Sequence, residues 1–154
     1  MSGDLAAATK AALIGELEKL GDAVRELAGP LDEGQFWKKP LAPGNSFGHL
    51  VLHLTGNLNW FVGAQLGGTG YVRDREREFT EARVPAKAEA LARLDEAVAT
   101  FRRVVEGLTA DRLTGPHPEA RFGTVIGALV SVTAHFALHR GQLSYIARLA
   151  PREA

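Results

Sequence analysis

Apolar residues recur every three or four positions in four segments of the chain, over residues 4–27, 47–61, 91–108 and 124–146. In the first segment the stripe consists of Leu13, Leu17, Leu20, Val24 and Leu27. Such spacing keeps apolar side chains on one face of an α-helix, and no segment shows the alternation typical of a strand. The pattern predicts four amphipathic helices that pack as an all-α four-helix bundle.

Residues that favour helix ends stand at the borders of these segments. The predicted signals are a stop at Gly29-Pro30, a cap at Asn45 or Ser46, a start near Pro85, a start near Thr124 and a stop at Pro151. The connections over residues 28–44, 66–84 and 109–123 are longer than bundle loops usually are. Connections of this length permit a crossover other than simple up-down-up-down.

The middle connection contains a run of alternating charges, Arg73-Asp74-Arg75-Glu76-Arg77-Glu78. A run of this kind is most often solvated. We expect a charged loop or a short extra helix here, and contact with a substrate is the alternative.

Length and charge restrict the classes of partner. The 154 residues fit a single domain over 1–154. Lysine plus arginine equals aspartate plus glutamate, 18 each, so we expect neither a nucleic acid nor an anionic membrane as partner. Zero net charge weakly favours self-association. We expect a cytoplasmic protein, because no apolar run could span a bilayer and the first residues lack the core of a signal peptide.

The chain has no cysteine, which excludes a disulfide, a cysteine nucleophile and an iron–sulfur cluster. A transition metal would need histidine and oxygen ligands. Four of the five histidines form two pairs spaced by four residues, His49 with His53 and His135 with His139. Residues four apart share a helix face and can reach one ion together.

The helical phase of each histidine refines this hypothesis. His139 lies near the centre of its apolar stripe and His135 about 60° to one side, so both should face the interior. His53 lies at the flank of the second stripe, and His49 lies about 40° further toward solvent. His117, between Pro116 and Pro118, is expected to be structural or exposed. Hydrogen bonds without a metal could also satisfy buried imidazoles.

Two segments resemble the DinB-like superfamily. Residues 135–146, which begin His-Phe-Ala-Leu-His-Arg-Gly-Gln, are similar to its HxxxHRGQ signature, and residues 45–54 resemble its second-helix motif. The resemblance implies a bundle with up-down-down-up topology, often dimeric, with a three-histidine metal site. The implied ligands are His53, His135 and His139, and a homodimer is expected. Many relatives carry another polar residue where this chain has His49.

Three imidazoles leave coordination positions open, as in catalytic rather than structural sites. Zinc, nickel, iron and cobalt all suit such ligands. The open site could generate hydroxide, polarise a carbonyl or favour a thiolate.

The superfamily includes transferases and an isomerase that use bacillithiol or mycothiol. The leading hypothesis is therefore a metal-dependent thiol S-transferase acting on a small-molecule thiol and an electrophile. The alternatives are a metal-dependent hydrolase using bound hydroxide and a non-catalytic metal-binding or stress-response protein.

Four further residues near these motifs have open roles. Asn57 could orient a ligand or hydrogen-bond a backbone group, and Arg140 could bind a substrate carboxylate or form an ion pair. Gln142 is placed to support a ligating imidazole. Gly141 suggests close packing against another helix or a second subunit, because glycine is costly inside a helix.

Overall fold

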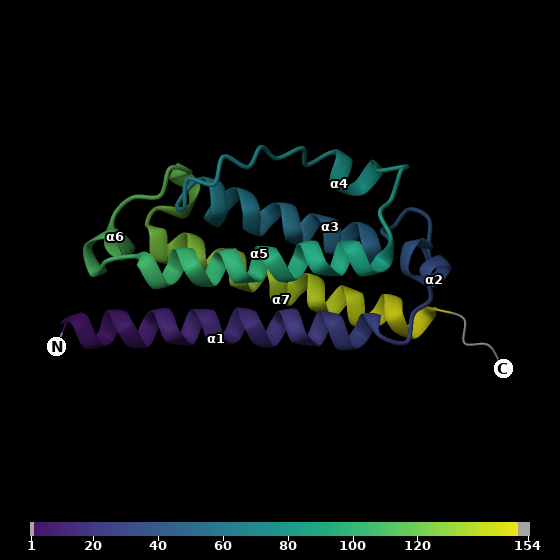
Figure 1. The fold of residues 1–154 in the computed structure, drawn as a ribbon, viewed down its shortest axis with the longest axis horizontal. Helices are drawn as coiled ribbons and strands as arrows, with labels where there is room; N and C mark the ends of the chain where they lie inside the picture. Colours follow the sequence, from purple (N-terminus) through teal and green to yellow (C-terminus); the bar gives the residue numbers. More distant parts are fainter. Residues whose placement is uncertain (1, 151–154) are drawn as a thin grey trace.

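The computed structural model describes residues 2–150, in which every regular element is a helix and no strand occurs (Figure 1). Four long elements correspond to the four predicted segments: α1 (Ser2–Ala28), α3 (Phe47–Leu58), α5 (Lys87–Gly107) and α7 (Val125–Leu149). The helix α3 continues directly into a π-helical turn, η1 (Asn59–Ala64). Short helices occupy the connections: α2 (Glu33–Trp37), α4 (Arg77–Thr80), α6 (Ala110–Thr114) and the 3-10 turn η2 (Ala120–Phe122).

The long helices follow the up-down-down-up order. In Figure 1, α1 and α7 run in one direction and α3 and α5 in the other. Each long helix packs on two others, α1 on α5 and α7, and α3 on α5 and α7. The chain between η1 and α5 returns along the outside of the bundle, and α4 packs against α3 on the way. This crossover allows α5 to begin at the same end as α3.

Side-chain caps fix where the helices begin. The Ser46 hydroxyl accepts a hydrogen bond from the backbone N–H of His49, so Ser46 rather than Asn45 is the cap of α3. Thr124 caps α7 in the same way through the N–H of Gly127. The helix α5 begins at Lys87, two residues after Pro85. The predicted stop at Pro151 lies outside the described residues.

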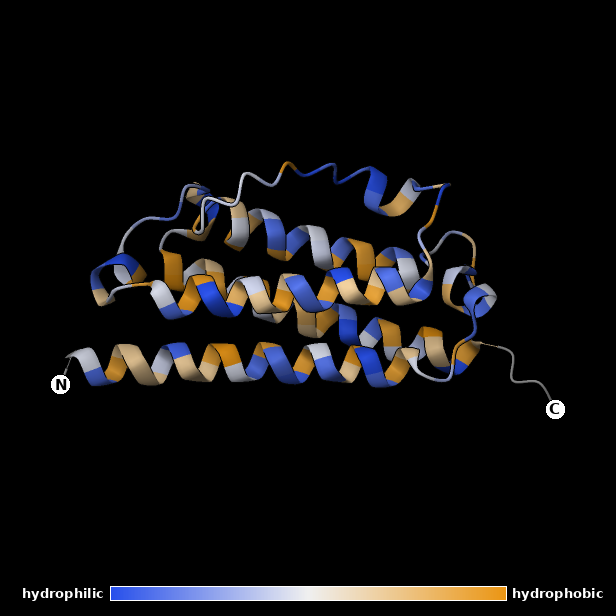
Figure 2. Ribbon diagram, in the orientation of Figure 1, coloured by the Kyte–Doolittle hydropathy of each residue, from blue (hydrophilic) through white to orange (hydrophobic). Residues whose placement is uncertain are grey.

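The core is built from the predicted apolar faces. Hydrophobic and hydrophilic residues alternate along the long helices, whereas the crossover is mostly hydrophilic where it approaches α4 (Figure 2). Leu50 and Leu54 of α3 and Val132 and Phe136 of α7 are at most 2% exposed. Burial of each such side chain contributes about 1.5–3 kcal/mol. These residues flank His53 and His135, so core packing fixes the backbone that carries both histidines. Within the described residues, no helix is both long and apolar enough to cross a membrane.

Candidate metal centre

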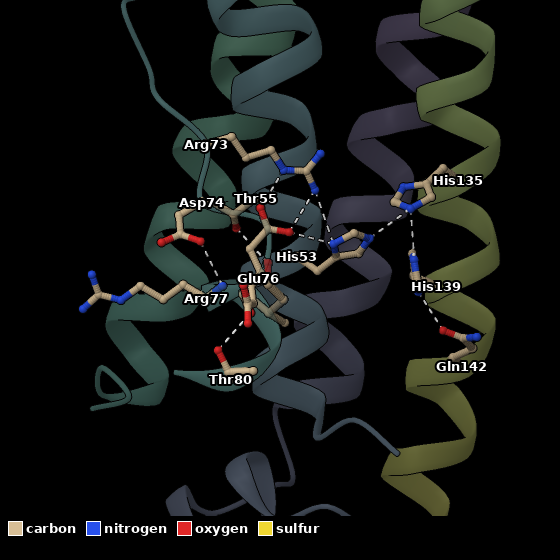
Figure 3. Close-up of polar contacts among 12 residues, drawn as sticks. His53, Thr55, Arg73, Asp74, Glu76, Arg77, Thr80, His135, His139 and Gln142 are labelled. Carbon is tan, nitrogen blue, oxygen red and sulfur yellow. Dashed lines mark hydrogen bonds and ion pairs between the residues drawn. The ribbon is translucent and has the colours of Figure 1, made fainter. Parts of the chain in front are cut away.

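Three histidines from two antiparallel helices converge on one point. The Nε2 atom of His135 lies 3.0 Å from Nε2 of His53 and 3.0 Å from Nε2 of His139. One nitrogen from each ring lies within 4.8 Å of the other two. Figure 3 shows His53 reaching from α3 toward the pair on α7. The predicted inward orientation of His53 is therefore confirmed, and the structure brings the three expected ligands together.

Hydrogen bonds orient two of the rings. Nδ1 of His53 lies 2.8 Å from Oε2 of Glu78, and an ionised carboxylate can only accept, so this nitrogen carries the proton. Nδ1 of His139 donates in the same way to Oε1 of Gln142, at 2.7 Å. Each ring therefore presents the lone pair of Nε2 to the cluster. The predicted contact of Gln142 with a clustered imidazole is therefore present, and support of a metal ligand stays a prediction.

The cluster disfavours protonated histidine. The pKa of His135 is lowered from 6.5 to about 4, mainly by burial and then by the neighbouring His139 and His53. Burial also lowers the pKa of His139, although its bond to Gln142 opposes this shift. Neutral imidazole is the form that binds a metal. The lowered pKa values therefore keep His135 and His139 in the ligand form at neutral pH.

The donor set fits a transition-metal ion. Tetrahedral nitrogen ligands at about 2.1 Å from zinc stand about 3.4 Å apart. Nε2 of His135 lies 3.0 Å from Nε2 of each of the other two histidines, slightly less than that spacing. Lone pairs directed at one another over this distance repel unless a cation or a proton lies between them. The buried Nδ1 of His135 has no hydrogen-bond partner among residues 2–150. Three protein donors leave room for further ligands, as in catalytic sites.

A buried ion pair supports His53 from the crossover. Glu78 is only 7% exposed. Its Oε1 accepts a hydrogen bond from Nε of Arg73 at 2.7 Å, and its Oε2 accepts one from Nη2 of Arg73 at 2.8 Å. Burial raises the pKa of Glu78, but the bonds from His53 and Arg73 outweigh it, so the net pKa is lowered and the carboxylate stays ionised. A Cβ at Gly56 would lie 2.0 Å from Oε1 of Glu78. Because glycine has no side chain, the carboxylate of Glu78 can lie directly against the backbone of α3 at this position.

The charged run over residues 73–78 was predicted to be solvated, but two of its side chains are buried. It does contain the short helix that was one expected outcome. Glu78 and Arg73, however, are buried against the histidine cluster, and the sequence interpretation missed both. The available signal was Gly56, which lies three residues after His53 and thus on nearly the same face.

His49 is not turned toward solvent, so that prediction was wrong. The side chain is only 7% exposed because the crossover and α2 cover this face of α3. Nδ1 accepts from the Ser46 hydroxyl at 2.6 Å, Nε2 donates to the Glu81 carbonyl at 3.2 Å, and the ring packs on Trp37. Both ring nitrogens of His49 therefore form hydrogen bonds with residues that do not belong to the three-histidine cluster. The geometry gives His49 a structural role.

The remaining candidates His117, Arg140 and Gly141 lie outside the histidine cluster. His117 is buried and structural: Nδ1 accepts from the Glu119 N–H and Nε2 donates to the Phe61 carbonyl. Arg140 is exposed and forms no ion pair with another described residue. Gly141 is also exposed, and a Cβ there would meet nothing within 4 Å. Packing of Gly141 against another helix of the same chain was therefore a wrong prediction, whereas contact with a second subunit stays a prediction.

A cavity of about 210 Å³ adjoins the cluster. Its walls come from α3, η1, η2 and α7, and they are formed by Asn57, Phe61, Arg121, Phe122, Ser131, Val132 and His135. A larger cavity, of about 670 Å³, lies beneath the crossover and is lined by Glu78 but by none of the three histidines. The smaller cavity is therefore the one through which a small molecule would reach His135.

The chain is similar in fold to two solved structures. A conserved protein from Enterococcus faecalis superposes with a TM-score of 0.75 at 16% identity, over 90% of this chain and 95% of that one. YfiT from Bacillus subtilis, described as a probable metal-dependent hydrolase with an unusual four-helix bundle topology, gives 0.71 at 19% identity, over 90% and 86%. A search of curated proteins gave no match.

A match to a protein family covers most of the sequence. Residues 12–149 match the family described as mycothiol-S-transferase. This range includes all three clustered histidines together with Glu78 and Arg73. The chain therefore belongs to the mycothiol S-transferase family, a DinB-like family.

Proposed function

We propose that His53, His135 and His139 bind one divalent transition-metal ion, and that the centre transfers a low-molecular-weight thiol to an electrophile. The observation that carries this proposal is the convergence of three Nε2 atoms, two of them on rings whose Nδ1 is held by Glu78 or Gln142. Family membership supports a sugar-containing thiol, mycothiol, as the thiol class. The absence of cysteine agrees with this function, since the reacting sulfur belongs to the cosubstrate.

Each protein group has a defined task in this proposal. A divalent ion held by neutral imidazoles lowers the pKa of a thiol and favours the nucleophilic thiolate. Glu78 fixes the ring of His53 and increases its basicity, and Gln142 does the same for His139. Arg73 keeps Glu78 ionised and in place.

The transfer itself needs no nucleophile from the chain. The sulfur forms a bond to the electrophilic carbon, the leaving group departs with its electron pair, and the thiol proton goes to solvent. Val132 and Phe136, at most 2% exposed, anchor the backbone of α7 on either side of His135. The cavity beside His135 gives the second substrate access to the reacting sulfur.

Thiol binding to cobalt-substituted protein tests the function. We expect mycothiol to produce a sulfur-to-cobalt charge-transfer band that grows with added thiol, and the analogue with oxygen in place of sulfur to produce none. Conjugation of the thiol to an electrophile should then be accelerated, and His139→Ala should abolish both signals. Without a band for mycothiol, bacillithiol or glutathione, the transferase proposal fails.

The same preparation distinguishes the hydrolase alternative. A hydrolase would cleave an ester or amide at a rate that follows deprotonation of water, and thiols would inhibit it by competing for the open position. The transferase predicts that added thiol increases turnover of the electrophile instead. A metal-loaded protein with neither activity and no thiol band would be a non-catalytic metal-binding protein.

A further inference from the structure

The cavity beside the histidine cluster has an unusual combination of walls. Two aromatic rings, Phe61 and Phe122, meet edge to face with centroids 5.2 Å apart. Asn57 and Ser131 contribute polar side chains, and His135 closes one side. At about 210 Å³, the cavity is smaller than the ~300–1,000 Å³ typical of sites for drug-sized ligands. It therefore suits the smaller of two substrates rather than a sugar-containing thiol.

Arg121 supplies a positive charge to this cavity. Its guanidinium carbon lies 4.9 Å from the centroid of Phe61 and 4.6 Å from that of Phe122. Stacking on two rings orders the side chain while leaving the edge of the guanidinium free for hydrogen bonds. Arg121 forms no ion pair with any residue from 2 to 150. Its charge is thus available to a ligand.

The loop that carries Arg121 is held firmly. Buried His117 bonds on one side to the Phe61 carbonyl and on the other to the N–H of Glu119. The carboxylate of Glu119 accepts a bond from the Gln65 amide at 3.0 Å, so this nearby acid is already engaged with a neighbour. The backbone N–H of His117 also donates a hydrogen bond to the backbone carbonyl of Gly123. Arg121 is therefore presented from a fixed backbone rather than from a loose loop.

We propose that this cavity binds the electrophilic substrate, and that the substrate carries a carboxylate that pairs with Arg121. A planar guanidinium pairs with a carboxylate through two parallel hydrogen bonds, which orients the ligand. The rings of Phe61 and Phe122 can pack against an aromatic or unsaturated substrate. The reacting carbon of that substrate would lie toward His135. This assignment rests on the proposed transferase function and specifies its second substrate.

Arg75 offers a matched control. It is also an exposed arginine stacked on a ring, with its guanidinium carbon 5.5 Å from the centroid of Phe79, which in turn packs on His53. It forms no ion pair with a described residue and does not line the cavity. Arg121→Met and Arg75→Met remove the same charge near the same cluster, but only the first changes the cavity wall.

Calorimetric titration of the metal-loaded protein with benzoate and benzamide tests the site. We expect Arg121→Met to weaken benzoate binding about tenfold, the size of a charge-assisted pair at a partly exposed site, and to change benzamide binding less than twofold. Arg75→Met should change neither by more than about twofold. Circular dichroism and metal content should match the parent protein in both variants. Unchanged benzoate binding in Arg121→Met, or equal losses in both variants, would overturn the assignment.

Turnover provides an independent readout. With mycothiol and 4-chloro-3-nitrobenzoate, a C–S bond forms, the C–Cl bond breaks and chloride leaves with the electron pair. Arg121→Met should raise KM for this acid about tenfold and leave KM for the matching benzamide unchanged. If the thiol band is absent while Arg121 still selects benzoate, the transferase proposal fails and the carboxylate site stands. If the band forms without selection by Arg121, the carboxylate site fails and the transferase stands.

Discussion

Glu78 accepts a hydrogen bond from Nδ1 of His53 at 2.8 Å, although the two residues are 25 positions apart in the chain. The bond connects the crossover to the histidine cluster, so the long connection between η1 and α5 is part of the centre. Arg73 comes from the same connection and completes the pair with Glu78. The crossover therefore serves the site as well as the topology.

Removing the Glu78 charge should weaken metal binding. We expect Glu78→Gln to lower metal affinity about 10- to 100-fold, because the partner that orients His53 becomes neutral. It should also lower the free energy of unfolding by about 3 kcal/mol, since Arg73 is left buried without its carboxylate. Competition with a chromophoric chelator and urea denaturation measure the two effects. Glu76→Gln, an exposed change in the same segment, is the control, and equal effects in both variants would contradict this role.

Gly56→Ala should also weaken metal binding, because the added methyl group would clash with the carboxylate of Glu78. The added Cβ would lie 2.0 Å from Oε1 of Glu78 and must displace the carboxylate. Metal affinity should fall by at least about tenfold. Gly15→Ala adds the same methyl group inside α1, where nothing lies within 4 Å, and it should stabilise the helix by about 0.5–1 kcal/mol without affecting the metal. Equal metal affinities in the two variants would show that Glu78 tolerates displacement.

The two histidines of α3 should differ sharply in metal binding. His53→Ala should lose most of the metal because it removes one of three converging nitrogens. His49→Ala should retain it, since both nitrogens of His49 bond to Ser46 and Glu81 instead. Elemental analysis of each purified variant measures the difference. The reverse ranking would mean that the ligand on α3 has been misidentified.

The metal-free protein should lose stability as the pH falls below neutrality. Above pH 6.5, His135 is neutral in both the folded and the unfolded state and contributes no pH dependence. Between pH 6.5 and about 4, the unfolded chain binds a proton that folded His135 refuses, because its folded pKa is lowered to about 4. The Tm of chelator-treated protein should therefore decrease over this range, and His135→Gln should flatten the decrease. Parallel curves for the two proteins would exclude this origin.

We also predict a homodimer that uses the outer face of α7. Val130, Leu138, Tyr145 and Leu149 are each more than half exposed, and their spacing places them on one side of the helix with Gly141. Light scattering at micromolar concentration should give twice the chain mass of 16.5 kDa. Leu138→Glu should shift the protein to the monomer. A monomer mass for the unmodified protein would end this prediction.

The sequence was sufficient to predict the bundle because burial of one helical face dominates its energetics. The stripes predicted the four long helices, and the spacing of His135 and His139 predicted a shared face. Glu78 could not be predicted in this way, since its approach to His53 depends on the path of the crossover and on the space left at Gly56. The orientation of His49 was wrong for a related reason, as a helical wheel contains no information on what covers α3.

The metal content of chelator-free protein tests the central claim most directly. Elemental analysis should find close to one transition-metal ion per chain, of whichever element the cell supplies. The variant with His53, His135 and His139 all replaced by alanine should remain helical by circular dichroism and contain almost none. Full metal occupancy in that triple variant, or a metal-free parent protein that takes up no zinc, nickel, iron or cobalt on titration, would contradict the three-histidine centre.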